Sequence, residues 1–273
     1  MAIGGPRRET GAHQITFESF GVRVRLVADR ADEVERAAAV LPPGSQRSEG
    51  PVDITYALGS SSSEAYELSR DGTVFVDDLS LDDAIWWLGR ELSDLIAVRA
   101  TDYVFVHAGA VAHKGRAIVM PGESHAGKST LVAALVRAGA VYLSDDFAPI
   151  DAAGMVHPYA RPLSLRRQGP AQVDYDIGSL GGVAGVEAVP LGLVVLTRYR
   201  QGADWRPRRL SAGDAVLALM ANTVRARAQP GETLRALTRS VDGALALQSD
   251  RDDADALAPL LLADLAGGPE ARD

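Results

Sequence analysis

The feature that most restricts how this chain can fold is a loop of small residues between an apolar run and a helix-like segment. It reads IVMPGESHAGKST and spans residues 118–130. Within it, GESHAGKS matches G-x-x-x-x-G-K-[ST], the pattern of a loop whose backbone N–H groups cradle phosphates. Such a loop joins the end of a strand to the start of a helix, so the pattern predicts an α/β fold built around that connection.

The same residues allow a second interpretation. With Ala126 in the last place, GESHA nearly matches G-x-S-x-G, the sharp turn that presents a serine nucleophile, here Ser124, in α/β-hydrolases. That chemistry needs an acid and then a histidine further along, which Asp145 or Asp146 and His157 could supply. However, Ala126 departs from the hydrolase pattern, and GKST would have no role. The phosphate-loop interpretation accounts for every residue and is favoured.

Lysine usage supports the phosphate loop. Lys and Arg together number 28, yet only Lys114 and Lys128 are lysines. A compact ammonium on a flexible stem can reach between phosphate oxygens where a planar guanidinium would not fit. We predict that Lys128 contacts the β- and γ-phosphates and that the Ser129 hydroxyl ligates Mg²⁺. The residues predicted to bind the nucleotide are Gly122, Glu123, Ser124, His125, Ala126, Gly127, Lys128, Ser129 and Thr130.

A pair of acids follows the loop closely. Asp145 and Asp146 end an apolar stretch 17 residues after Lys128, with one predicted helix and one predicted strand between them. Two adjacent carboxylates repel each other and are costly without a cation nearby. The two acids therefore favour a metal site, and the short connection predicts that their strand lies close to the strand feeding the loop. We assign the general base to Asp145 and a Mg²⁺ ligand, together with Ser129, to Asp146.

Composition narrows the class of protein. The 273 residues include no cysteine, which excludes disulfides, thiolate metal sites and a cysteine nucleophile. The net charge of -8 argues against broad nucleic-acid binding. No apolar run approaches the roughly 18 residues that cross a membrane, and the N-terminus lacks the apolar core of a secretory signal. We expect a cytoplasmic protein with no nucleic-acid or membrane partner; a homo-oligomer is compatible with the sequence.

Apolar periodicity predicts that residues 1–100 form a small α+β region. Alternation of apolar and polar residues is typical of half-buried strands, and an Asp-Gly pair at 71–72 predicts a hairpin turn. Ser80 is predicted to cap a helix, from which Trp86 and Trp87 pack against a neighbouring layer. The predicted strands span 14–21, 22–27, 52–58, 65–69 and 73–76, and the first predicted helix spans 31–41.

Residues 101–268 are predicted to form one α/β domain that carries the loop. A hairpin with its turn at Lys114 and Gly115 feeds the loop. The segment 169–190 is rich in glycine and poor in large apolar residues, which predicts a mobile loop that closes over the site as a lid. The predicted strands are 104–113, 116–120, 140–144, 147–150, 191–197 and 243–248, and the predicted helices are 129–138, 211–221, 231–240 and 253–265.

Together these features resemble a known family. The stretch VHAGAVAHKGRAIVMPGESHAGKSTLVAALVRAGAVYLSDDFAPID is similar to the catalytic core of HPr kinase/phosphorylase and of HPr-kinase-like serine kinases. The shared order is a histidine strand, a glycine turn, the phosphate loop, a short helix and strand, and an acidic pair. The resemblance covers residues 103–170, and by architecture about as far as 265. It implies an α/β P-loop core of the HPr kinase and PEP carboxykinase type, with a mixed sheet and flanking helices.

The resemblance also implies an activity, namely ATP- and Mg²⁺-dependent phosphorylation of a serine hydroxyl on a peptide, a protein or a small molecule. Residue by residue, it places His107 beside the site and puts Lys128 and Ser129 on phosphate and metal. Asp145 and Asp146 share the base and metal roles.

Departures from the family pattern follow the acidic pair. HPr kinase/phosphorylases carry a signature of the form Glu-x-Arg-Gly-x-Gly, where this chain reads LSLRRQG. Arg166 matches and is predicted to be catalytic, while Ser164 replaces the Glu and Arg167 the first Gly. With Arg161, these arginines could bind an acidic acceptor or phosphates. The lost Glu weakens the case for the reverse, phosphate-removing activity, which the sequence leaves open.

The N-terminal region shows no likeness to the usual first domain of HPr kinase/phosphorylase. The chain is therefore more similar to the HPr-kinase-like branch, some of whose members are associated with lasso and other ribosomal peptide pathways. Two other functions stay open: a nucleotide-binding regulatory module, and an ATPase without an acceptor. The intact acidic pair argues against the module, because nucleotide binding alone requires no base.

Overall fold

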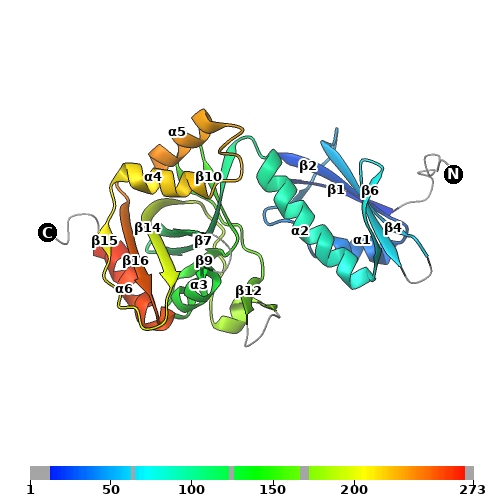
Figure 1. The fold of residues 1–273 in the computed structure, drawn as a ribbon. Coiled ribbons are helices and arrows are strands. Elements are labelled where there is room, and N and C mark those ends of the chain that lie inside the picture. Colours follow the sequence, from blue (N-terminus) through cyan, green and yellow to red (C-terminus); the bar gives the residue numbers. More distant parts are fainter. Residues whose placement is uncertain (1–12, 63–64, 123–125, 167–171, 268–273) are drawn as a thin grey trace. The chain divides into compact units, whose positions relative to one another are not determined.

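The computed structural model describes residues 13–62, 65–122, 126–166 and 172–267. The chain divides into two compact units, Met1–Thr101 and Asp102–Asp273 (Figure 1). Across the described residues, six α-helices and three β-sheets give a mixed α/β architecture. No helix in these ranges is long and apolar enough to cross a membrane. The cytoplasmic location stays a prediction.

The first unit is built on a six-stranded sheet in the order β3-β1-β2-β4-β5-β6. β2 and β4 run parallel, and the other neighbouring strands run antiparallel. The predicted hairpin turn is confirmed, because Asp71 and Gly72 have φ of 47° and 80°, as a tight hairpin turn requires. The elements are β1 (His13–Ser19), β2 (Val22–Ala28), α1 (Ala31–Ala38), β3 (Gln46–Arg47), β4 (Ile54–Ser60), β5 (Tyr66–Arg70), β6 (Thr73–Leu79) and α2 (Leu81–Arg99).

Helix α2 begins as the sequence predicts but presents its tryptophans differently. The Ser80 hydroxyl caps it by accepting the backbone N–H of Asp83 at 3.2 Å. Trp86 and Trp87 are 51% and 42% exposed, and their rings meet edge to face with centroids 5.4 Å apart. The prediction that they pack against a neighbouring layer is therefore wrong. Aliphatic residues such as Leu88 already fill the buried side of the helix, which leaves the indoles on its solvent side.

The second unit is built on an eight-stranded mixed sheet with the path β11-β10-β7-β8-β14-β16-β15, and β9 also pairs with β7. β8, β14 and β16 run parallel, so their carboxyl ends share one edge. β12 and β13 form a separate hairpin. The elements up to that hairpin are β7 (Tyr103–His113), β8 (Arg116–Pro121), α3 (Lys128–Arg137), β9 (Val141–Ser144), β10 (Phe147–Asp151), β11 (Met155–Val156), β12 (Leu163–Arg166) and β13 (Gln172–Tyr175). The later elements are the 3-10 turn η1 (Ile177–Leu180), β14 (Val189–Tyr199), β15 (Arg208–Arg209), α4 (Ala212–Ala221), α5 (Pro230–Ser240), β16 (Leu245–Arg251) and α6 (Ala254–Gly267).

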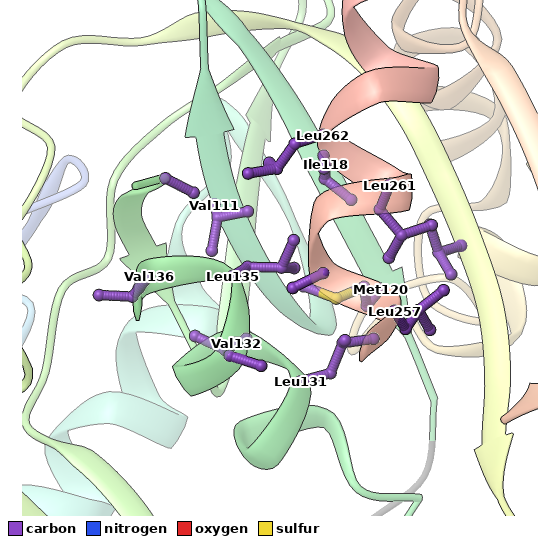
Figure 2. Close-up of a cluster of buried hydrophobic side chains, with 14 of the residues drawn as sticks. Val111, Ile118, Met120, Leu131, Val132, Leu135, Val136, Leu257, Leu261 and Leu262 are labelled. Carbon is purple, nitrogen blue, oxygen red and sulfur yellow. The ribbon is translucent and has the colours of Figure 1, made fainter. Parts of the chain in front are cut away.

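Helices cover both faces of this sheet. α3 and α6 pack over one face, where Ile118 and Met120 of β8 are buried (Figure 2). α4 and α5 cover the other face, where Ala117 and Val119 are buried. The alternation follows from the strand geometry, in which successive side chains point to opposite faces. Because α3 packs on the sheet beside α6, its first residue is held near the end of β8.

The strand preceding the acidic pair lies close to the loop strand, as the sequence predicts, with one strand between them. β9 pairs with β7, so β7 lies between β9 and β8. β10 pairs with the same edge of β7, with Phe147 opposite His107 and Ser144 of β9 opposite Ala110. Asp145 and Asp146 therefore lie at the junction of two strands that share one neighbour.

The glycine-rich segment 169–190 is not an open loop where the structure describes it. Residues 172–175 form β13, and the following residues run along α3 and β9. Tyr142 N donates to Val183 O at 2.9 Å, and Gly185 N donates to Tyr142 O at 2.7 Å. A Cβ on Gly185 would lie 2.6 Å from Leu143 Cδ2. The small residues of this segment allow the close approach of Gly185 to β9, and the closing motion of a lid stays a prediction.

Candidate functional site

The ends of the predicted phosphate loop lie at the carboxyl end of β8 and the start of α3. Ala126 Cβ is 3.6 Å from the position that a Cβ on Gly122 would take, so the two ends approach closely. Thr130, in the first turn of α3, is exposed. The predicted nucleotide contacts of three further residues fall outside the described residues, namely Glu123, Ser124 and His125.

Gly127 forms the entry to α3. Its φ of 83° and ψ of 20° lie in the left-handed region, which glycine enters without the Cβ penalty. Its carbonyl accepts the Leu131 N–H at 3.2 Å and an N–H of Arg251 Nη2 at 2.7 Å. The N–H groups of the first helical turn, with the positive end of the helix dipole, therefore start at a fixed point beside the loop.

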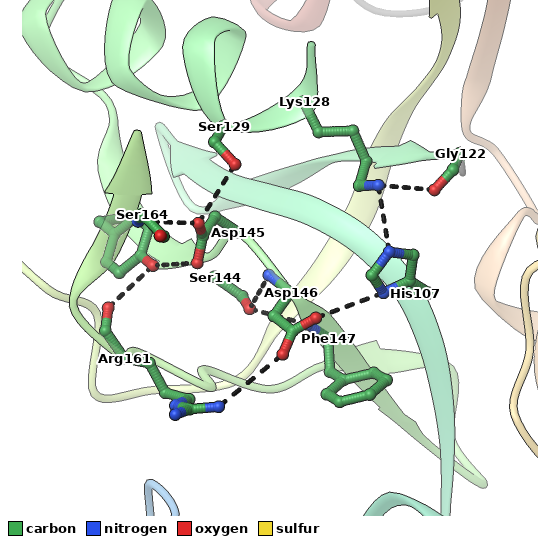
Figure 3. Close-up of polar contacts among 11 residues, drawn as sticks. His107, Gly122, Lys128, Ser129, Ser144, Asp145, Asp146, Phe147, Arg161 and Ser164 are labelled. Atoms are coloured by element: carbon green, nitrogen blue, oxygen red, sulfur yellow. Dashed lines mark hydrogen bonds and ion pairs between the residues drawn. The ribbon is translucent and has the colours of Figure 1, made fainter. Parts of the chain in front are cut away.

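Lys128 links Gly122 to His107 in a chain of polar contacts that continues to Asp146 (Figure 3). Its ammonium donates to Gly122 O at 2.6 Å and lies 3.2 Å from His107 Nε2. Partial burial lowers the pKa of Lys128, and the charges of Asp146 and Asp145 oppose that shift. An ammonium has no lone pair to accept with, so Nε2 must accept, and a neutral His107 then carries its proton on Nδ1.

That proton faces the second acid. His107 Nδ1 lies 3.3 Å from Asp146 Oδ1, and Arg161 Nη1 lies 3.9 Å from Asp146 Oδ2. The Asp146 backbone is fixed as well, since its N–H donates to Ser144 Oγ and its carbonyl accepts the Ala108 N–H. The Asp146 side chain is 37% exposed, so its carboxylate is oriented by two neighbours and still reachable from solvent.

Asp145 has a different set of partners. Its Oδ2 accepts the Ser129 hydroxyl at 3.2 Å and the Ser164 N–H at 3.2 Å. The Tyr142 hydroxyl lies 3.0 Å from Asp145 Oδ1 and 2.9 Å from Arg161 O, and its single proton can serve one of them at a time. The two adjacent acids thus belong to two sub-sites, one with Ser129 and one with His107.

Partial burial raises the pKa of the Asp145 carboxyl, although the hydrogen bonds from Ser164 and Tyr142 oppose the shift. The folded protein therefore holds this proton more tightly than the unfolded chain. Below the unfolded pKa, about 4, the carboxyl is neutral in both states and carries no penalty. As pH rises from there to the folded pKa, stability falls, because the unfolded state ionises first. A bound cation would remove this penalty.

Sequence reasoning assigned Arg161 to an acidic acceptor or to phosphates and did not find Tyr142, Ser144 or Arg251. Tyr142 lies three residues before Asp145, where a regular strand would turn it to the other face. An irregular register between β7 and β9 brings its hydroxyl to the carboxylate. Arg251 is far away in the sequence and belongs to no motif. Arg166 ends β12, where its backbone pairs with Gln172 of β13. The structure does not describe its side chain, so its catalytic role stays a prediction.

The hydrolase interpretation requires His157 to pair with Asp145 or Asp146, but in the structure His157 pairs with a different acid. His157 Nε2 lies 2.8 Å from Asp151 Oδ2, and its ring meets Tyr103 edge to face. His157 is thus paired with Asp151 at the end of β10, whereas Asp145 faces Ser129 and Asp146 faces His107.

The donor set suits Mg²⁺ with a nucleotide. No cluster of three or more His, Cys, Asp or Glu side chains lies within metal-binding reach in the described part of the chain. Mg²⁺ does not need one, because it is usually held by one or two carboxylates and substrate phosphates and keeps several waters. The Ser129 hydroxyl and the partly buried Asp145 carboxylate would supply oxygen ligands to such a metal, and Lys128 with the start of α3 would supply positive charge for phosphates.

Comparisons with known proteins add little. No family model matches the chain, and no curated protein matches it. Among solved structures, the Hpr(Ser) kinase/phosphatase from Coxiella burnetii is similar with a TM-score of 0.34 and 14% sequence identity. The alignment covers 60% of this chain and 94% of that one. A likeness of this size carries no argument for function, and the sequence motif and the site geometry must indicate the function by themselves.

Proposed function

We propose that the second unit is a Mg²⁺- and ATP-dependent kinase that transfers the γ-phosphoryl group to a hydroxyl. The acceptor class implied by the sequence resemblance is a serine of a peptide, protein or small molecule. The observation that carries the proposal is the separation of the acidic pair: Asp145 contacts the loop serine Ser129, while Asp146 is oriented by His107. A nucleotide-binding module needs the first sub-site but not the second.

In this proposal Ser129 and Asp145 hold Mg²⁺ and Lys128 binds phosphate oxygens. The bound Mg²⁺ and ATP supply an activated phosphoryl group whose negative charge the metal neutralises. The partial burial of Asp145 favours this role, because an anion that is costly alone is stabilised by a cation beside it.

Asp146 is then the general base. Its exposed carboxylate can accept the proton of an acceptor hydroxyl, while His107 and Arg161 hold its orientation. This division reverses the one inferred from the sequence, which gave the base to Asp145 and the metal to Asp146. The contact between Ser129 and Asp145 favours the reversal.

The first test compares the two lysines. Lys128→Ala is expected to abolish Mg·ATP binding measured by calorimetry, because it removes the charge at the start of α3. Lys114→Gln removes the same charge from the β7–β8 turn and should bind as wild type does. Equal binding by both variants would show that the loop does not hold phosphate.

The second test separates the acids with an acceptor panel of serine peptides, proteins and free serine. Asp146→Asn should keep Mg·ATP affinity and lose at least about a hundredfold in phosphoserine formation, a usual general-base contribution. Asp145→Asn should instead raise the Mg²⁺ concentration required for ATP binding. The opposite pattern would restore the division drawn from the sequence. Orthophosphate as the sole product with every acceptor would favour the ATPase alternative.

A further inference from the structure

The proposed site accounts for the phosphates and the acceptor but not for the nucleoside. Ser129 contacts Asp145, just beyond β9, and Lys128 contacts His107 of β7, so the metal and the terminal phosphate belong on the β7 side of the loop. Asp146 lies on that same side. The rest of a nucleotide must therefore extend across the loop, away from β7.

On the other side of the loop strand lie β14 and β16, both parallel to β8. In open α/β sheets, ligands bind beyond the carboxyl ends of parallel strands. β8 leads into the phosphate loop, and the neighbouring ends are Tyr199 of β14 and Arg251 of β16, which are paired in register. The topology thus puts these two side chains next to the loop, on the side opposite the acids.

Both residues approach the last glycine of the loop. A Cβ on Gly127 would lie 3.6 Å from Tyr199 Cβ and 2.6 Å from Arg251 Nη2. They differ in exposure, because Tyr199 is 56% exposed and Arg251 only 2%. A large aromatic residue left in solvent beside a phosphate loop has no packing role that explains its exposure.

Arg251 has the character of an internal support. One guanidinium nitrogen donates to Gly127 O at 2.7 Å and another to Asp252 O at 3.1 Å. Its Nε has no hydrogen-bond partner among the described residues. A buried guanidinium with an unused donor is costly. Its place here is explained if it fixes the loop backbone and adds positive charge behind the phosphate-binding N–H groups.

We propose that Tyr199 is the platform on which the base of the bound nucleotide stacks, and that Arg251 is a positioning residue that holds Gly127 for the phosphates. The inference rests on the proposed nucleotide site and adds the residue of that site that would contact the nucleoside. Tyr199 contacts the ligand, whereas Arg251 acts through the Gly127 carbonyl. The two residues should therefore respond differently to a ligand that lacks a nucleoside.

The test measures the Kd of the full chain for Mg·ATP and for Mg·tripolyphosphate by calorimetry. Tyr199→Ala should weaken ATP binding about tenfold, the scale of one base–aromatic stack, and leave tripolyphosphate binding unchanged. Tyr199→Phe keeps the ring and should bind both ligands as wild type does. Arg251→Gln should weaken both ligands together.

The outcomes separate this inference from the proposed function. If the wild type binds neither ligand, the nucleotide site itself is wrong. If it binds both but Tyr199→Ala weakens neither, or weakens both equally, the base does not stack on Tyr199 although the phosphate site stands. Arg251→Gln weakening ATP alone would overturn the positioning role of Arg251.

Discussion

Replacement of Gly127 by alanine tests whether the loop is held from behind as the structure indicates. Two separate costs are expected. The residue has a φ of 83°, a left-handed conformation that costs a residue with a Cβ about 1–2 kcal/mol. The new Cβ would also lie 2.6 Å from Arg251 Nη2. That distance is too short between a methyl carbon and a nitrogen, so the guanidinium must shift, and we expect it to release the Gly127 carbonyl.

The expected loss of stability comes from the backbone strain and from the lost hydrogen bond between Arg251 and the Gly127 carbonyl. A hydrogen bond to a charged group is worth about 1.5–3 kcal/mol, so Gly127→Ala should destabilise the second unit by about 2.5–5 kcal/mol. Gly115→Ala is the matched control, because Gly115 has a φ of 75° and a Cβ there would meet nothing within 4 Å. It should cost only the backbone term. The difference, about 1.5–3 kcal/mol, corresponds to a Tm about 3–12 °C lower for Gly127→Ala.

The assay uses the position of the tryptophans. Of the three tryptophans, Trp86 and Trp87 lie in the first unit, and Trp205 packs against the core of the second unit. With Trp86 and Trp87 changed to Phe, fluorescence during thermal unfolding reports the second unit alone. Equal Tm values for Gly127→Ala and Gly115→Ala would refute the reasoning, because the Arg251 contact would then contribute nothing beyond backbone strain.

Two further predictions concern burial. Asp145→Asn should stabilise the protein without Mg²⁺, with a gain that is absent near pH 4 and grows toward neutral pH, because the wild-type carboxylate becomes charged in a partly buried site. Urea unfolding from pH 4 to 8 measures this gain, and a variant less stable than wild type at every pH would contradict it. Gly185→Ala should destabilise by about 1–3 kcal/mol, because its Cβ would overlap Leu143 Cδ2. Val186→Ala, at a 90% exposed neighbour, should change stability by less than about 0.5 kcal/mol in the same experiment, and equal effects would show that this segment is not packed.

Local signals in the sequence predicted local structure well. The hairpin at Lys114 and Gly115 follows from two positions that need positive φ, with observed values of 49° and 75°. Ser80 caps α2 through a neighbour three residues away. The change from an apolar run to GKST predicted a strand, a loop and a helix, which the structure has as β8 and α3. Each of these features depends on residues within a few positions of one another.

The glycine-rich segment shows what composition alone does not decide. Glycine lowers the cost of motion, and it also allows close approach of chains. Residues 169–190 suggested motion, yet Gly185 lies against Leu143 of β9. The sequence does not show what a missing Cβ faces, so it cannot distinguish the two uses. The exposed indoles of α2 are a similar case, since only the packed unit shows which sides of the helix are filled.

The sequence by itself determined the chemical groups of the site: a lysine and a serine at a helix start, and two acids at a strand end. Only the tertiary structure decided how they are divided, because Asp145 and Asp146 are adjacent in the chain and differ only in what is folded against them. β7 brings His107 to one acid, and α3 brings Ser129 to the other. Arg251 reaches Gly127 across 124 residues, by the parallel pairing of β8, β14 and β16. Pairing between strands so far apart in the sequence depends on the whole sheet, and therefore no local pattern of residues predicts it.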